Sequence, residues 1–183
     1  KLNINYAMVI TTNSGLWRYK IGDTVKFTCL NPYRIKITGR TKHFINVFGE
    51  ELVIENAEKA LSLTSELTKS SISDYTVGPV FMGSKTKGSH EWLIEFDKQP
   101  DDLNKFMEIL DLNLQSLNSD YEAKRYKSST LELPKLVVAR KNLFYDWLSS
   151  KNKLGGQNKI PRLSNSREFI EELISMNQET AFK

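Results

Sequence analysis

The hydrophobic pattern of this chain changes its period near residue 50, and that change limits the fold more than any other feature. Residues 4–48 contain short β-rich runs separated by Gly, Asn and Pro, a pattern that favours a small antiparallel sheet or partial barrel. From Glu50 onward, apolar residues recur at helical spacing between short strand-like runs. The sequence therefore predicts an α+β fold, in which a small β-rich, partial-barrel segment precedes an α/β lobe with a mostly antiparallel sheet and helices.

Turn residues divide the first zone into short expected strands. Asn, Gly and Pro mark turns at 13–15, 22–23 and 31–32. The expected strands are 4–10, 16–21, 24–30, 34–38 and 44–47. In this interpretation Gly22 and Asp23 form a turn, and Asp23 lies at the end of a strand.

The second zone predicts the order α-β-β-α-β-α-α, with the helices on one face of the sheet. Asp101 is the expected cap of the second helix, and Asn165 with Glu168 resembles a capping box for the last one. The apolar face expected for the second helix consists of Leu103, Phe106, Met107, Leu110, Leu114 and Leu117. The expected helices are 53–67, 103–117 with a second short helical piece at 121–127, 144–148 and the one after 165. The expected strands are 72–82, 91–96 and 136–139.

Composition excludes several classes of protein. The 183 residues are 39% hydrophobic and 26% charged, which is typical of a globular chain. No apolar run approaches the roughly 20 residues needed to span a bilayer, so no membrane partner is expected. Cys29 is the only cysteine, which excludes an internal disulfide. With only His43 and His90 beside it, the sequence contains no zinc pattern and predicts no metal site.

Charge and the first residues give two further expectations. The net charge of +4 and pI near 9.0 suit anionic ligands such as nucleotides, although solubility alone could explain them. The chain starts at Lys1 and enters a strand-like segment at once, which suggests a fragment of a longer protein. A basic, apolar leader is absent and cysteine is scarce, so a reducing, cytoplasmic location is expected.

The segment 155–163, GGQNKIPRL, combines a mobile approach with a stiff exit. Gly155 and Gly156 give the backbone unusual freedom, whereas Pro161 fixes its own φ and favours an extended Ile160. Lys159 lies between them, and a lysine ammonium is a compact charge suited to an oxyanion or phosphate. The alternative is a surface loop between two helices with a solvated lysine, and the nine residues alone favour it.

Three other constellations could carry chemistry, and each has a plain structural alternative. In WRYKIGD (17–23), an acidic residue after a Gly turn could bind a ribose diol, or simply its own backbone. GRTK (39–42) and NVFGEE (46–51) lie where the hydrophobic period changes from strand to helix, which would suit a hinge between two lobes. The alternative is a solvated turn. NSDYEAKR (118–125) taken alone is best interpreted as an exposed helix with i,i+3 and i,i+4 charge pairs.

One apparent phosphate-binding motif is rejected. The stretch 78–86, GPVFMGSKT, superficially resembles a P-loop, but that motif needs Lys directly after the second Gly and a helix after it. Here Ser84 intervenes and the sequence continues into a strand. A hairpin loop is therefore expected.

Taken together, WRYKIGD, GRTKHFINVFGEEL, NSDYEAKR and GGQNKIPR resemble the carboxy-terminal part of the auxin-responsive acyl-acid amido synthetases. That family belongs to the adenylate-forming superfamily of acyl-CoA synthetases, peptide-synthetase adenylation domains and luciferases. The resemblance covers essentially all 183 residues. NSDYEAKR and GGQNKIPR are specific to the family, and the GEEL stretch looks more like its bacterial members.

The resemblance implies a role for several residues. Asp23, with Tyr19 and Gly22, would bind the ribose of ATP, and Arg40 would lie near the nucleotide at the junction of two lobes. Thr41 and Lys42 would form the hinge. Lys159 would be the catalytic lysine that approaches the carboxylate and the α-phosphate. Residues 1–40 would be the last β-rich subdomain of the large amino-terminal lobe, and residues 41–183 the mobile carboxy-terminal lobe.

The implied reaction has two steps and uses ATP with Mg²⁺. A carboxylic acid is first adenylated, and an amine, such as an amino acid, then takes the acyl group. The phosphate loop of the family lies upstream of this segment, so the fragment alone is expected to be inactive, with the amino-terminal lobe of the same protein as its partner. Two alternatives stay open: an acyl-CoA ligase of the same superfamily, or a non-catalytic basic module that binds nucleic acid. No RNA-binding aromatic motif supports the second, so no nucleic-acid partner is expected.

Overall fold

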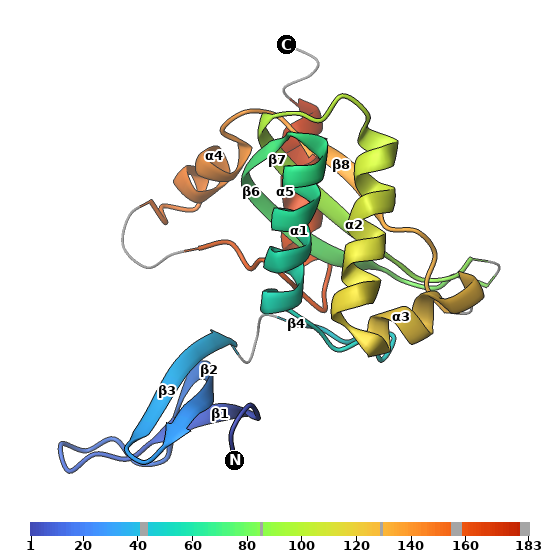
Figure 1. Ribbon diagram of the computed structural model, residues 1–183. Helices are drawn as coiled ribbons and strands as arrows, with labels where there is room; N and C mark the ends of the chain where they lie inside the picture. Colours follow the sequence, from blue (N-terminus) through green and yellow to red (C-terminus); the bar gives the residue numbers. More distant parts are fainter. Residues whose placement is uncertain (41–43, 85, 129, 155–158, 180–183) are drawn as a thin grey trace.

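The first forty residues form a three-stranded antiparallel sheet in a computed structural model that describes residues 1–40, 44–84, 86–128, 130–154 and 159–179. The strands are β1 (Asn5–Ile10), β2 (Tyr19–Leu30) and β3 (Tyr33–Arg40), in the order β1-β2-β3. This sheet projects from the rest of the molecule (Figure 1). The prediction of a small antiparallel sheet is therefore confirmed.

The predicted turn at Gly22 and Asp23 is wrong. Both residues lie inside β2, which continues from Tyr19 to Leu30. The register between β1 and β2 shifts between Ala7 and Val9, so the extra residues form a bulge. Gly22 adopts a φ of 88° there, which glycine tolerates without steric cost. Asp23 is consequently in mid-strand rather than at a strand end.

The first sheet has two chemically different faces. Register places Tyr6 and Ile37 on either side of Val25 on one face, and Asn5 and Lys36 on either side of Lys26 on the other. On the polar face, Lys26 forms an ion pair of 3.5 Å with Glu55 in the first helix of the main body. On the apolar face Ile37 remains 64% exposed. The sheet is thus amphipathic, and the described chain leaves its apolar face largely uncovered.

The main body is built on a second three-stranded sheet, which follows a short pair of strands. The pair is β4 (Phe44–Ile45) with β5 (Leu52–Val53). In the larger sheet, β6 (Ser71–Val80) pairs antiparallel with β7 (Ser89–Lys98), and β7 pairs parallel with β8 (Lys135–Ala139). Residues 81–88 join β6 to β7, which confirms the hairpin loop expected in place of a P-loop. The α+β fold class is confirmed.

Helices cover both faces of this sheet, so the prediction of helices on one face is wrong (Figure 1). Trp92 and Ile94 of β7 pack with the residues of one apolar core, whereas Leu93 between them packs with a second core on the opposite face. The first core includes α1 (Ile54–Thr68), α2 (Leu103–Leu117) and α3 (Ser119–Arg125). The second includes α4 (Leu143–Ser150) and α5 (Glu168–Glu179). A one-turn 3₁₀ helix, Tyr126–Ser128, follows α3.

Two predicted helix caps are corrected. Asp102, not Asp101, caps α2, because its carboxylate accepts hydrogen bonds from the backbone N–H groups of Asn104 and Lys105. The side chain of Asn165 instead binds the backbone of the β4 segment. It donates to the carbonyl of Phe44 at 2.9 Å and accepts from the N–H of Asn46 at 2.8 Å. Asn165 thereby ties the approach to α5 to the start of the main body.

Within the described ranges, no helix combines the length and the apolar character that crossing a membrane requires.

Gly88 offers a test of how closely the main body is packed. A methyl group added there would lie 2.5 Å from the ring of Phe48. We expect Gly88→Ala to lower the free energy of unfolding by about 1–3 kcal/mol, the usual cost of overpacking, in urea denaturation. The matched control is Gly83→Ala in the same loop, where the new methyl would meet only the hydroxyl of the exposed Thr86 side chain, which can rotate away into solvent. Equal effects of the two substitutions would contradict the close contact.

Candidate functional site

The segment that follows Lys159 is fixed to the outer edge of β6. The Val77 N–H donates to the carbonyl of Arg162 at 2.9 Å, and the Ser164 N–H donates to the carbonyl of Val77 at 3.1 Å. The Thr76 hydroxyl adds a bond of 2.7 Å to the Pro161 carbonyl. Ile160 is buried in the second apolar core and Leu163 in the first. Hydrogen bonds and both cores therefore hold this segment.

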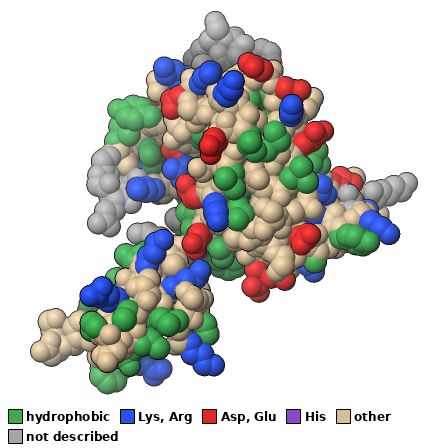
Figure 2. Space-filling view, in the orientation of Figure 1, with side chains coloured by type: hydrophobic (Ala, Val, Ile, Leu, Met, Phe, Trp, Pro, Cys, Tyr) green, Lys and Arg blue, Asp and Glu red, His purple; other side chains and the backbone are tan. Residues whose placement is uncertain are grey.

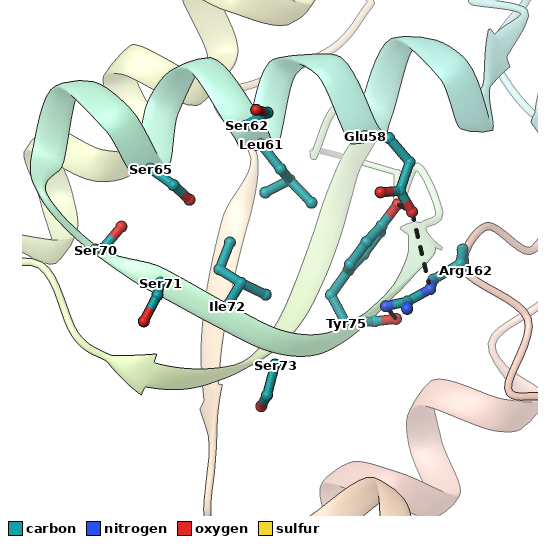
Figure 3. Close-up of a pocket in the computed structure, with 10 residues that line it drawn as sticks. All are labelled: Glu58, Leu61, Ser62, Ser65, Ser70, Ser71, Ile72, Ser73, Tyr75 and Arg162. Atoms are coloured by element: carbon teal, nitrogen blue, oxygen red, sulfur yellow. Dashed lines mark hydrogen bonds and ion pairs between the residues drawn. The ribbon is translucent and has the colours of Figure 1, made fainter.

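Arg162 is surrounded by groups from two elements (Figure 3). Its guanidinium pairs with Asp74 of β6 and lies 3.9 Å from Glu58 of α1. It also stacks over the ring of Tyr75, 4.6 Å from the centroid, while the Tyr75 hydroxyl donates to Glu58 at 3.0 Å. This cluster closes one end of a pocket of ≈ 330 Å³ that is also lined by Ser62, Ser65, Ser70, Ser71 and Ser73. Burial and the neighbouring carboxylates raise the pKa of Tyr75 well above its usual range, so it stays a neutral donor.

Lys159 itself is exposed and lies in the connection between α4 and α5. The expected loop between two helices is therefore present, but Gly155 and Gly156, to which mobility was assigned, lie outside the described residues. The segment runs parallel to β6 through the bridge between Val77 and Leu163, so Lys159 lies towards the Asp74 end of that strand. Burial raises the pKa of the Asp74 carboxyl, while the positive charges of Arg162 and, to a smaller extent, Lys159 oppose the rise. An exposed cation thus stands directly before a rigidly held segment.

The residues predicted for nucleotide binding lie on the first sheet. Tyr19, Gly22 and Asp23 belong to β2, and Asp23 is opposite Arg40 of β3 in the register. The same forty residues contain seven Lys or Arg and a single acidic residue, Asp23. Basic and apolar side chains are interspersed over this sheet (Figure 2). The sheet is therefore a cationic surface, which is compatible with an anionic ligand.

The structure brings some of the predicted site residues together and leaves others apart. Asp23 and Arg40 are cross-strand neighbours on the first sheet, whereas Lys159 lies at the edge of the sheet of the main body. Thr41 and Lys42, the predicted hinge, lie outside the described residues, and the hinge stays a prediction. Within the described ranges, no group of three or more His, Cys, Asp or Glu side chains could hold a metal ion.

The GEEL motif contains a buried hydrogen bond between a carboxylate and a histidine that the sequence did not reveal. Glu50 is fully buried and accepts a hydrogen bond of 2.8 Å from Nε2 of His90, which is buried as well. Its other oxygen accepts from the Phe48 N–H at 2.7 Å. Burial raises the pKa of Glu50, but the hydrogen bonds and charge of His90 and the backbone N–H groups outweigh it, so the net pKa is lowered. His90 is 40 residues away in sequence, so only the fold brings the pair together.

The NSDYEAKR motif is structural, and its interpretation as an exposed charged helix is wrong for its key residues. Tyr121 is buried and donates to Asp111 of α2 at 2.7 Å. Arg125 binds both oxygens of Asp111 at 2.8 Å and the carbonyl of Leu131 at 2.7 Å. Asn118 caps α3 and donates to the carbonyl of Glu51 at 3.2 Å. The motif therefore connects α2 and α3 to the GEEL segment.

Family models cover both zones of the chain. The GH3 family central domain matches residues 1–40, and the GH3 family C-terminal domain matches residues 55–168. The chain belongs to the GH3 family. No curated protein sequence matches it significantly. The first family model ends at residue 40 and the second begins at residue 55, on either side of the change in hydrophobic period near residue 50. The predicted domain boundary between residues 40 and 41 stays a prediction.

Two solved structures resemble this GH3 chain over nearly its whole length. "GH3.15 acyl acid amido synthetase" matches with a TM-score of 0.75 and 21% identity, over 98% of this chain and 34% of that chain. "AtGH3.15 acyl acid amido synthetase in complex with 2,4-DB" matches with a TM-score of 0.72 and 21% identity, over 96% and 33%. This level of identity establishes the fold. The chain spans about one third of the length of these solved relatives.

The Glu50–His90 pair makes stability depend on pH. Because the pKa of Glu50 is lowered on folding, its ionised form stabilises the fold above its ordinary pKa of 4.5, and this contribution is lost as the pH falls through the lower folded pKa. We expect Glu50→Gln to lower the free energy of unfolding by about 1–3 kcal/mol at pH 7. Urea denaturation should show that the free energies of unfolding of the variant and the wild type become more similar as the pH falls below 4.5.

The control for this experiment is Glu51→Gln, because Glu51 is exposed. It should change stability by less than about 0.5 kcal/mol at either pH. A Glu50→Gln deficit that is the same at pH 7 and pH 3.5 would contradict the role of the buried carboxylate.

Proposed function

We propose that this chain is the carboxy-terminal portion of an ATP-dependent acyl-acid amido synthetase of the adenylate-forming superfamily. The longer protein would adenylate a small-molecule carboxylic acid and transfer the acyl group to an amine, such as an amino acid. Membership of the GH3 family supports this proposal. The observation that carries it is the exposed Lys159, which directly precedes a segment that the main body holds rigidly.

In the first step, Lys159 supplies positive charge where two anions meet. The carboxylate attacks the α-phosphorus of ATP, forming the acyl–phosphate bond and releasing pyrophosphate. Negative charge accumulates on the phosphate oxygens, and a preorganised cation stabilises that charge more than it stabilises the separated reactants. In the second step the amine attacks the acyl carbonyl and AMP leaves. Lys159 is then withdrawn by rotation of the carboxy-terminal lobe about Thr41 and Lys42.

Nucleotide recognition is assigned to the first sheet. Asp23 would accept hydrogen bonds from the ribose hydroxyls, with Tyr19 and Gly22 beside it and Arg40 close to the phosphates. The basic character of residues 1–40 favours a polyanionic ligand. In this proposal Mg²⁺ arrives with ATP, bound to its phosphates.

The amphipathic first sheet supports a partner within the same protein. Its apolar face, with Ile35 and Ile37 at least half exposed, is the kind of surface that a folded protein usually buries. The solved relatives are about three times as long as this chain. We propose that the amino-terminal lobe of the longer protein covers this face and that the present segment is inactive without it. The single cysteine, Cys29, fits a cytoplasmic location for the assembly.

Replacing Lys159 tests the adenylation role in the full-length protein. Lys159→Ala should lower the rate of acid-dependent pyrophosphate exchange by about 10²–10³-fold, because one stabilising charge, worth about 3–4 kcal/mol, is lost from the transition state. Amide formation from pre-made acyl adenylate should survive, since Lys159 is withdrawn in that step.

Lys153→Ala is the matched control, because Lys153 is also exposed after α4, and it should leave both half-reactions unchanged. Pyrophosphate exchange by Lys159→Ala within about threefold of wild type, a deficit under about 1 kcal/mol, would make Lys159 an ordinary solvated lysine. Assays of the second step with a thiol in place of the amine separate amide synthesis from the acyl-CoA ligase alternative.

Asp23 provides an independent test of the nucleotide site. In the full-length protein, Asp23→Ala should weaken ATP binding by about 1.5–3 kcal/mol through loss of a charge-assisted hydrogen bond, measured by isothermal titration calorimetry. Asp23→Asn keeps an acceptor and should lose less. Unchanged ATP affinity in the alanine variant, with folding intact, would remove Asp23 from the site.

A further inference from the structure

Arg162 holds a carboxylate that would otherwise be available to Lys159. The guanidinium pairs with Asp74 and lies near Glu58, and its side chain is 30% exposed. The stack on Tyr75 and a hydrogen bond of 3.4 Å to the Tyr75 carbonyl fix its orientation. Arginine is always charged, and its planar fork matches a carboxylate better than an ammonium does. Asp74 therefore has a strong, preorganised partner.

The parallel bridge between Val77 and Leu163 runs the segment alongside β6, which places Lys159 at the Asp74 end of that strand. The charge of Lys159 helps to oppose the rise in the pKa of Asp74 that burial causes. Yet in the described part of the chain, Lys159 forms no ion pair and stays exposed. Only Ile160 and Pro161 separate it from Arg162, and the hydrogen bonds of residues 161–164 to β6 keep this short stretch beside that strand.

We propose that Arg162 is a positioning residue, which occupies Asp74 and so keeps the ammonium group of Lys159 available to an anionic ligand. Without Arg162, Asp74 would be a half-buried carboxylate with no cation in contact, and we expect the flexible side chain of Lys159 to turn towards it and form an ion pair. A lysine paired with Asp74 would be held at the β6 edge. The functional meaning of this arrangement rests on the adenylation role proposed for Lys159, but the electrostatic arrangement itself does not.

A purely structural role for Arg162 makes a different prediction. Suppose that Arg162 only anchored the segment to β6. Removing Asp74 in addition to Arg162 would then leave the altered reactivity of Lys159 unchanged or alter it further. If Arg162 instead keeps Asp74 from Lys159, removing Asp74 should restore Lys159. The double substitution therefore separates the two roles.

The test measures the reactivity of Lys159 in this 183-residue chain. Wild type, Arg162→Gln, Asp74→Asn and the double variant are treated with a trace of an acetylating succinimidyl ester, and mass spectrometry follows each lysine. Pairing with Asp74 favours the protonated, unreactive amine, so Lys159 in Arg162→Gln should be labelled about two- to fivefold more slowly, the range of a surface ion pair. In the double variant the rate should return to the wild-type value.

Lys153 is the internal control and should react equally in all four proteins. Arg162→Gln keeps hydrogen-bonding capacity, and circular dichroism reports whether it stays folded. If it does not, Arg162→Lys provides a weaker partner for Asp74, and a smaller slowing with the same rescue is expected. Unchanged labelling of Lys159 in the folded Arg162 variant, or no recovery in the double variant, would overturn the proposal.

Pyrophosphate exchange in the full-length protein distinguishes this proposal from the adenylation role. Arg162→Gln should slow exchange, and adding Asp74→Asn should restore it. If labelling follows the expected pattern but exchange does not respond to any Lys159 variant, the positioning role stands and the catalytic assignment fails. If labelling does not respond while Lys159→Ala abolishes exchange, the catalytic assignment stands and the positioning role fails.

Discussion

The pairing of residues 160–164 with the edge of β6 determines how the candidate site is built. The backbone bonds to Val77 and the burial of Ile160 and Leu163 in opposite cores give this stretch one position. Lys159 is the first described residue before it and has none of these restraints. The side chain of Lys159 can move. The backbone that follows Lys159 is fixed to the main body and can move far only together with it. A large displacement of Lys159 therefore requires rotation of that body as a unit.

Most secondary structure could be predicted because the relevant signals are local. The helical spacing of the apolar residues located α1 and α2, and the turn residues at 13–15 and 31–32 separated β1, β2 and β3, although β3 continues past its expected end at residue 38 to Arg40. Gly22 was misread because a glycine with positive φ serves a turn and a bulge equally well. Helices on both faces could have been predicted from the continuous run Trp92-Leu93-Ile94, because a strand buried on both sides lacks alternation.

The candidate site was less accessible to sequence reasoning. Lys159 and Asp23 came from a family resemblance, and neither residue has a local pattern that favours function over a solvated loop or turn. The partners of Arg162 lie 88 and 104 positions earlier in the chain, and nothing near any of them indicates the others. The same holds for Glu50 with His90 and for Asp111 with Arg125. Buried polar pairs of this kind depend on tertiary structure alone, which is why the charged motif NSDYEAKR was taken for surface.

The segment after Lys159 has a second consequence for the molecule. β6 is an outer strand of its sheet, and an outer strand with free backbone groups can pair with a strand of another molecule and start aggregation. Residues 162–164 satisfy the backbone of Val77 in the middle of that edge. The part of the chain that presents Lys159 to solvent thus also shields the sheet, so selection for solubility and selection for lysine placement act on the same few residues.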